Sequence, residues 1–144
     1  MPFQLPDVSK TLEQLDGQVW GEPEWQSHLV LECHRLRRVP LGEFTPADLR
    51  ILIGQSMDLE FLVPLAFQAL AHDPLLDAEY YAGDLLSALL RSDTAFWTVH
   101  PDLRAELASI AEEGKLRFEA LDECDRELSA SAFYDDLSHF QRSA

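Results

Sequence analysis

The sequence predicts an all-α fold: a compact bundle of about six to eight helices, or an array of helical hairpins, in a single domain spanning residues 1–144. Apolar residues recur every three or four positions, and the strict alternation typical of β-strands is rare. Helix-start signals, in which a capping side chain precedes a proline or an acid, occur several times. With 144 residues, 47% of them hydrophobic, the chain can bury a core without disulfides or metals.

The N-terminal segment combines loose and helical parts. Residues 1–10 contain prolines and are expected to be loose. Thr11 and Gln14 form a capping box for a short helix that ends at residues 16–17. Residues 20–25 contain Gly, Pro and two tryptophans, which predicts a loop folded onto the body.

A second helix is expected from Ser27, its N-cap, to about Arg38, before Pro40 stops it. Cations in its last turn suit the negative end of the helix dipole. These cations are Arg35, Arg37 and Arg38. The expected apolar face comprises Leu29, Val30, Cys33 and Leu36 or Arg37.

The strongest helix start is Thr45, which is followed by Pro46 at the first helical position and Asp48 at the third. Gly54 is expected to end this helix, and Gln55 to bury its amide against helix-end carbonyls. Residues 57–71 are apolar almost all round, which predicts a central helix. Pro64 either kinks this helix or begins a new one.

The second half of the chain is also expected to be helical, with Gly114 as an interruption. The stripe Leu103, Leu107, Ile110 and Ala111 marks the buried face before it. The predicted helices run from Asp84, as N-cap, to about Arg91, from the Asp93 cap through Trp97, from Pro101 to about Glu113, from Lys115 to about Glu127 and from Ser131 to about Phe140.

The strongest bulk signal is charge: 26 acidic residues against 11 basic ones give a net charge of -15. Residues 41–100 carry nine acids and only two arginines. This balance argues against direct binding to nucleic acid or to an anionic membrane, and it suits a basic protein partner. Acidity that only maintains solubility is the alternative. Cys33 and Cys124 are too few for a disulfide scaffold, and the first 15 residues lack a signal-peptide pattern, so we expect a cytoplasmic protein with both thiols reduced.

No motif predicts catalysis, a cofactor or a metal site. The five histidines have no metal-ligand spacing with either cysteine, and His28 with Glu32 supplies only two ligands. A nucleophile elbow, a P-loop and a dinucleotide fingerprint are absent from the sequence. We therefore predict that the chain is not an enzyme. The remaining enzymatic alternative is a small hydrolase that uses paired carboxylates, which sequence spacing does not reveal.

The candidate binding site is the acidic, tyrosine-containing loop at residues 73–84. Aromatic side chains with a charged surround supply energy and specificity in many protein interfaces. The alternative is a solvated loop whose tyrosines fold back onto the core. The candidate residues are Asp73, Asp77, Glu79, Tyr80, Tyr81 and Asp84.

Four blocks of the sequence form a recognisable series: TLEQLD with WGEP at 11–23, SHLV and LRRVPL at 27–41, DLRILIGQSMDLEFLVPLA at 48–66 and YYAGDLL at 80–86. With these blocks the sequence resembles a helical family of immunity proteins from bacterial contact-dependent growth inhibition systems. The resemblance covers about residues 11–103. Ala82 departs from the proline expected before Gly-Asp, and the tail from about Lys115 matches none of the family's blocks.

The resemblance implies a non-enzymatic protein that binds the toxic C-terminal domain of a cognate surface-delivered effector and neutralises it inside the cell. Such toxins are often nucleases, which tend to be basic. The net charge of -15 on this chain agrees with a basic partner. The family's motifs resemble fold determinants, so the loop residues are predicted from their own chemistry. The alternative function is an acidic helical module that recognises another basic protein.

Overall fold

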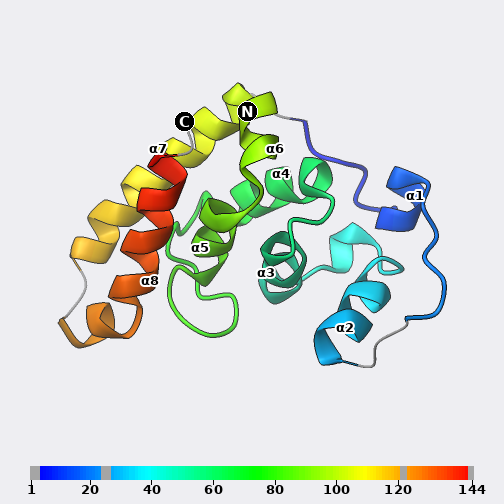
Figure 1. Cartoon of the computed structure of the whole chain (residues 1–144), viewed down its shortest axis with the longest axis horizontal. Coiled ribbons are helices and arrows are strands. Elements are labelled where there is room, and N and C mark those ends of the chain that lie inside the picture. Colours follow the sequence, from blue (N-terminus) through cyan, green and yellow to red (C-terminus); the bar gives the residue numbers. More distant parts are fainter. Residues whose placement is uncertain (1–3, 24–26, 121–122, 143–144) are drawn as a thin grey trace.

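The computed structural model describes residues 4–23, 27–120 and 123–142, with side chains described outside residues 123–132. Within these ranges the chain folds into eight α-helices and one short 3-10 helix, η1, and contains no β-strand (Figure 1). The all-α prediction is confirmed. The helices are α1 (Leu12–Asp16), α2 (His28–Leu36), η1 (Leu41–Glu43), α3 (Pro46–Gly54), α4 (Leu59–Leu70), α5 (Asp84–Arg91), α6 (Thr94–Val99), α7 (Pro101–Glu119) and α8 (Glu123–Arg142). In the part of the chain described, no helix has the length and hydropathy needed to cross a membrane.

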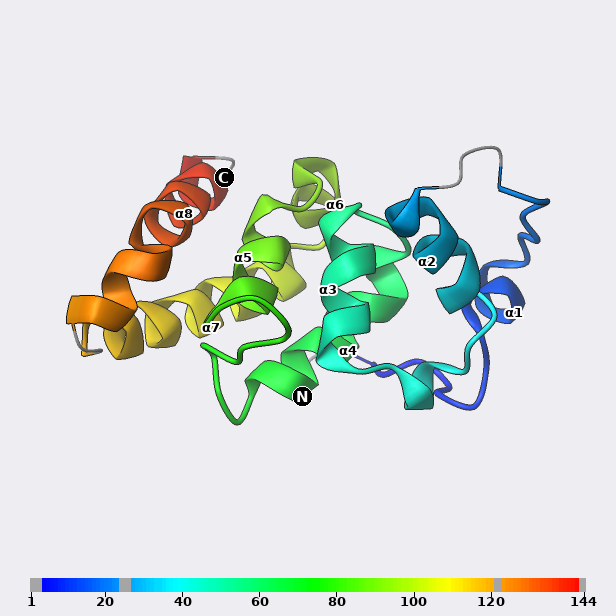
Figure 2. The same ribbon diagram turned by 90° about the horizontal axis from the view of Figure 1, so that it is seen from below.

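Helix α5 lies at the centre, with α3 packed on one side and α8 on the other (Figures 1 and 2). Every residue of α5 from Asp84 to Leu90 is buried. Helix α4, which the sequence predicted to be central, shares the core but leaves Gln68 exposed and Leu65 half-buried. The more enclosed helix is therefore α5, because neighbouring helices cover both of its sides.

Four of the predicted N-caps are confirmed: Thr11, Ser27, Thr45 and Asp93. Thr11 and Thr45 each form a capping box, and Ser27 and Asp93 accept hydrogen bonds from backbone amides in the first turns of α2 and α6. Pro101 takes the first position of α7. These starts are set by local side-chain chemistry, which the sequence displays directly.

The end of α3 differs from the prediction at Gly54. Gly54 is the last helical residue, and the left-handed residue that follows is Ser56, with a φ of 54°. The Ser56 amide donates to the Ile53 carbonyl at 2.8 Å, and the Met57 amide donates to the Leu52 carbonyl at 3.1 Å. This pair of bonds is a Schellman motif closed by serine instead of glycine.

The junction between α3 and α4 corrects two further expectations. Gln55 is the C-cap of α3 and is exposed, not buried. Asp58 is also left-handed, with a φ of 49°, so α4 begins at Leu59. Pro64 lies inside α4 and does not begin a new helix. The bond that Pro64 cannot make would reach the carbonyl of Glu60, an exposed residue in the first turn of α4.

Helix α2 ends at Leu36, two residues before the predicted end. Arg37 caps it and is buried instead of standing at a solvent-exposed helix terminus. Leu29, placed on the apolar face by its spacing, is 41% exposed. The buried face of this short helix is therefore narrower than periodicity suggested, and Cys33 and Leu36 form it.

The C-terminal third folds into two long helices instead of three pieces. Gly114 does not interrupt α7, which continues to Glu119. A Cβ atom at Gly114 would lie 2.8 Å from Cδ2 of Leu86, so close packing on α5 explains the glycine. The pieces predicted at residues 115–127 and 131–140 are likewise wrong: the first splits between α7 and α8, and the second lies inside α8.

The two C-terminal helices pack on the core through aromatic rings. Phe118 of α7 stacks on Phe133 of α8 with ring centroids 4.9 Å apart. Phe140, near the end of α8, meets Trp97 of α6 edge to face at 6.1 Å. All four rings are buried. The tail beyond the region of family resemblance thus completes the hydrophobic core.

Candidate functional site

The candidate binding loop, residues 73–83, connects α4 to α5 and is called the acidic loop below (Figure 1). Tyr80 is its most prominent side chain, with 68% of its surface exposed. Asp73 and Asp77 are also exposed, whereas Tyr81 is half-buried. The loop therefore presents one aromatic ring and several carboxylates to solvent, as the interface hypothesis requires.

Asp84 holds the acidic loop in shape from beneath. Its side chain is buried, and its two carboxylate oxygens accept three backbone hydrogen bonds from Ala78, Glu79 and Tyr80, at 2.7, 3.0 and 3.0 Å. The sequence prediction that Asp84 is the N-cap of α5 is wrong. Gly83, with a φ of 86°, is the N-cap, and Asp84 is the first helical residue. From that position its carboxylate turns back under the loop.

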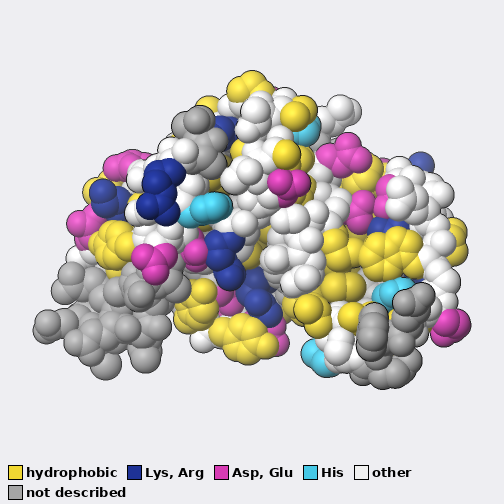
Figure 3. All heavy atoms as spheres, viewed as in Figure 1, with side chains coloured by type: hydrophobic (Ala, Val, Ile, Leu, Met, Phe, Trp, Pro, Cys, Tyr) yellow, Lys and Arg dark blue, Asp and Glu magenta, His cyan; other side chains and the backbone are white. Residues whose placement is uncertain are grey.

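Arg50 of α3 supports the exposed tip of the loop. Its guanidinium carbon lies 4.6 Å from the centre of the Tyr80 ring, and Nη2 pairs with the Glu79 carboxylate at 3.0 Å. Its Nε lies 3.8 Å from the Asp84 carboxylate. In Figure 3, basic and apolar side chains adjoin at the lower edge of the molecule, where the acidic loop of Figure 1 lies. One cation thus joins three of the predicted residues into a single cluster.

The structure does not bring all the predicted residues together. Asp73 accepts a hydrogen bond from the Leu75 amide at 3.0 Å and lies 3.9 Å from Arg117 of α7, at the other end of the loop. Asp77 makes no ion pair with a described residue, so its exposed carboxylate is available to a partner. The structure therefore gathers Glu79, Tyr80 and Asp84 around Arg50 and leaves the other three candidates outside this cluster. These are Asp73, Asp77 and the half-buried Tyr81.

Sequence reasoning missed Arg50 and the neighbouring surface of α2. A crevice of about 170 Å³ runs between α2, α3 and the loop, and Leu29, Glu32, Ile51 and Tyr80 are among its walls. A signal for Arg50 was present, because it is one of two basic residues among residues 41–100. Nothing in the sequence indicates that Leu29 is exposed, because its helical spacing is that of a core residue.

A second charged cluster centres on Arg37, which is 1% exposed. Its guanidinium pairs with Asp16 at 2.9 Å and with Asp58 at 2.8 Å, and it donates to the Gln18 carbonyl at 2.7 Å. The ring of Trp20 covers it, with its centroid 4.5 Å from the guanidinium carbon. This cluster ties α1, α2 and the α3–α4 junction together. Trp20 therefore packs on the body as predicted, while Trp25 lies outside the described residues.

The two carboxylates that share Arg37 differ in proton affinity. Burial, together with the neighbouring Asp16 carboxylate, raises the pKa of Asp58 to about 6. The pKa of Asp16 is lowered by hydrogen bonds from Gln18, Asp58 and Arg37, which outweigh its own burial. Because one cation serves two anions, the pair shares a proton near pH 6.

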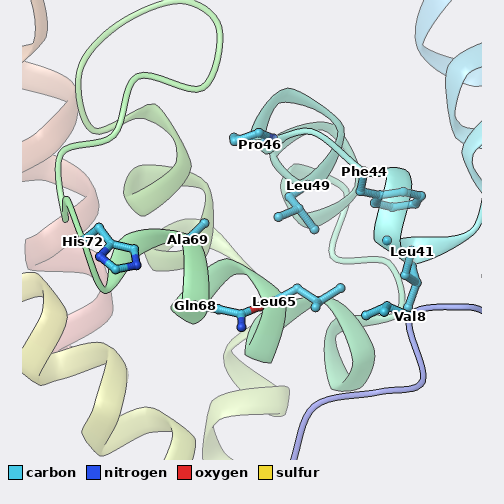
Figure 4. A pocket seen from close by; sticks show the side chains of 10 residues that line it. Val8, Leu41, Phe44, Pro46, Leu49, Leu65, Gln68, Ala69 and His72 are labelled. Atoms are coloured by element: carbon cyan, nitrogen blue, oxygen red, sulfur yellow. The ribbon is translucent and has the colours of Figure 1, made fainter.

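The largest hollow that we describe is an apolar one of about 490 Å³ between η1, α3 and α4 (Figure 4). Leu41, Phe44 and Leu65 form part of its wall, and His72 is its one titratable side chain among those described. The Gly42 amide donates to the Val8 carbonyl at 2.8 Å, which ties part of the N-terminal segment to η1.

Metal ligands and reactive thiols give no further site among the described residues. No group of three or more His, Cys, Asp or Glu side chains in that part of the chain has a metal-binding arrangement. Cys33 is buried, and this burial raises the pKa of its thiol, which makes it a weak nucleophile. The side chain of Cys124 lies outside the described residues.

Comparison with known proteins gives one match. Residues 14–107 match the profile of a family described as CDI immunity proteins. No curated protein and no solved structure matches the chain significantly. The matched range contains the Arg37 cluster, α3 to α6 and the whole acidic loop.

Proposed function

This chain belongs to the CDI immunity proteins, and from this membership we propose that it binds the toxic C-terminal domain of a cognate contact-dependent growth inhibition effector in the cytoplasm and neutralises it. The family match is the observation that carries the proposal. Neutralisation by binding needs neither catalysis nor a cofactor. The charged clusters at Arg37 and Arg50 join helices and order the acidic loop, which a binding role also needs.

We propose further that the toxin is a basic nuclease. A net charge of -15 would accelerate encounter with a basic partner and make the association rate fall with added salt. Acidic side chains of the immunity protein would compete with nucleic-acid phosphates for the toxin's Lys and Arg residues. The toxin would then be inhibited by occlusion of its substrate path.

The acidic loop is the toxin-binding surface in this proposal. Tyr80 offers an exposed ring as an anchor, and Asp77 offers a carboxylate without an internal ion pair. Asp73 and Tyr81 would contribute at the edges, and Glu79 would act together with Arg50. Asp84 is buried, so its part is to hold the loop in its binding shape. A preordered loop loses less conformational entropy on binding, which favours slow dissociation.

A binding experiment tests this assignment. The purified toxin domain would be titrated with the wild type, with Asp77→Lys and with Tyr80→Ala, at low and at moderate salt. Loss of the ring is expected to weaken binding by about 2 kcal/mol, roughly 30-fold, if Tyr80 is an interface anchor. Asp77→Lys is expected to slow association and to reduce its salt dependence.

The control is Glu112→Lys, which makes the same charge change at an exposed position of α7. It should retain the wild-type affinity to within about threefold. If all three variants bind as the wild type does, the loop is not the interface, and the surface assignment fails while the family function stands.

A further inference from the structure

A second hollow, of about 420 Å³, lies where the start of α4 faces α6. Three carboxylates line it, those of Asp58, Glu60 and Asp93. None of the nine described residues that form its wall is Lys or Arg. The inner side of Asp58 meets buried Arg37, but Glu60 is exposed and makes no ion pair with a described residue.

The rest of the wall is largely apolar. Phe96 is half-buried there, and Val99 is 72% exposed, an unusual exposure for a large aliphatic side chain. The His100 ring stacks on Phe96 with centroids 4.3 Å apart, and its Nδ1 lies 2.9 Å from the Phe96 carbonyl oxygen. The hollow thus combines an aromatic wall, an exposed aliphatic side chain and negative charge.

The same chain shows how such a combination is filled elsewhere. Trp20 lies beside the carboxylates of Asp16 and Asp58, and Arg37 inserts between the ring and the acids. Tyr80 lies beside Glu79 and Asp84, and the space is occupied by Arg50. Guanidinium groups suit these places because their planar faces stack on rings while their edges donate to carboxylates. The hollow at Phe96 has the ring and the acids, and no arginine is among the described residues that line it.

We propose that this hollow receives an arginine side chain of the bound toxin. The guanidinium would stack against the Phe96 side of the hollow and donate to Glu60 and Asp93, while the aliphatic part of the side chain would pack on Val99. This inference rests on the proposed function. It extends the interface from the acidic loop to a second point of contact.

One toxin domain can reach both points. Arg50, which supports the loop, lies four residues before Gly54 at the end of α3, about 6 Å along the helix axis, and Ser56, which lines the hollow, follows two residues later. An interface of standard size covers about 800 Å² on each partner, which is enough to span this distance. The charge balance at the hollow also favours a cation, because the carboxylates of Glu60 and Asp93 lie there and its described wall holds no Lys or Arg.

The test compares Glu60→Lys with Glu112→Lys, which reverses an exposed charge on α7 away from the hollow. The toxin domain would be co-purified with this chain, separated in denaturant, refolded and titrated with each variant. We expect Glu60→Lys to bind at least about 10-fold more weakly than the wild type and Glu112→Lys less than about threefold more weakly. A photo-crosslinking amino acid in place of Val99 should attach to a toxin peptide that contains an arginine.

The outcomes separate this inference from the proposed function. If the wild type binds toxin, Glu60→Lys matches Glu112→Lys and the crosslinker captures no toxin, the hollow is not a contact and only the inference is overturned. If the wild type itself binds no toxin, the proposed function is overturned and the inference with it. The melting temperatures of both variants should be close to that of the wild type. A loss of binding then reflects a change at the surface and not unfolding of the variant.

Discussion

Replacing Asp84 by Asn should loosen the acidic loop without changing the shape of the side chain. The carboxylate accepts three backbone hydrogen bonds, and an amide offers only one acceptor oxygen. The best orientation of the new side chain leaves at least one buried N–H facing an NH₂ group. Hydrogen bonds to charged groups contribute about 1.5–3 kcal/mol each, and an unsatisfied buried donor costs about 1–3 kcal/mol. Together these give an expected loss of about 2–4 kcal/mol.

A loss of this size is readily measured. For a domain of this length, about 3–4 °C of melting temperature corresponds to 1 kcal/mol, so Asp84→Asn should melt about 6–16 °C below the wild type. Urea unfolding gives the free energy directly. Native-state hydrogen exchange should show faster exchange at the amides of Ala78, Glu79 and Tyr80, which donate to this carboxylate.

The matched control is Asp77→Asn, the same chemical change at an exposed position in the same loop. It should shift stability by no more than about 0.5 kcal/mol. If Asp84→Asn is as stable as Asp77→Asn and the three amides keep their protection, the carboxylate does not order the loop. The account of how Tyr80 is presented would then be refuted.

Two further predictions concern packing and pH. In urea unfolding, Gly114→Ala should destabilise the protein by about 1–2 kcal/mol, because overpacking against Leu86 exceeds the gain in helix propensity. The control Gly54→Ala, whose Cβ would meet nothing within 4 Å, should stabilise it by up to about 1 kcal/mol. Equal effects of the two substitutions would contradict the packing argument. The pKa of Asp58 is raised from 3.8 to about 6 in the folded state, so between these pH values the folded protein holds a proton that the unfolded chain has lost. The stability that this proton contributes is present below pH 4 and is lost as the pH rises through 6. Asp58→Asn mimics the protonated form, so its free energy of unfolding should match that of the wild type near pH 4 and exceed it by about 1–3 kcal/mol at pH 7.5, where Asp16 stays ionised in both proteins. A difference in stability that does not change with pH would contradict this reasoning.

Local signals in the sequence predicted the helix starts well. A capping side chain and the residues that follow it act within one turn, so Thr11 and Thr45 could be assigned from the sequence alone. Gly114 misled the prediction, whereas α3 does end at Gly54. Glycine permits a helix end, but it also permits close approach, and only the position of Leu86 in space shows that Gly114 serves packing.

The candidate site was predictable in composition but not in architecture. The cluster of tyrosines and acids in the sequence identified the acidic loop, and Tyr80 is indeed exposed. The support of the loop depends on Arg50, 30 residues away in the sequence, and on a carboxylate that turns back from the first position of α5. Contacts at such separation depend on how α3 packs against α5, which no local pattern records.

The most direct test of the proposed function is co-expression. The C-terminal domain of the large surface protein encoded immediately upstream would be produced with and without this chain, with growth and co-elution on a sizing column as readouts. We predict that the domain alone arrests growth, that this chain restores growth, and that the two proteins elute together. A domain that is harmless, or whose toxicity this chain leaves unchanged, would contradict the immunity function.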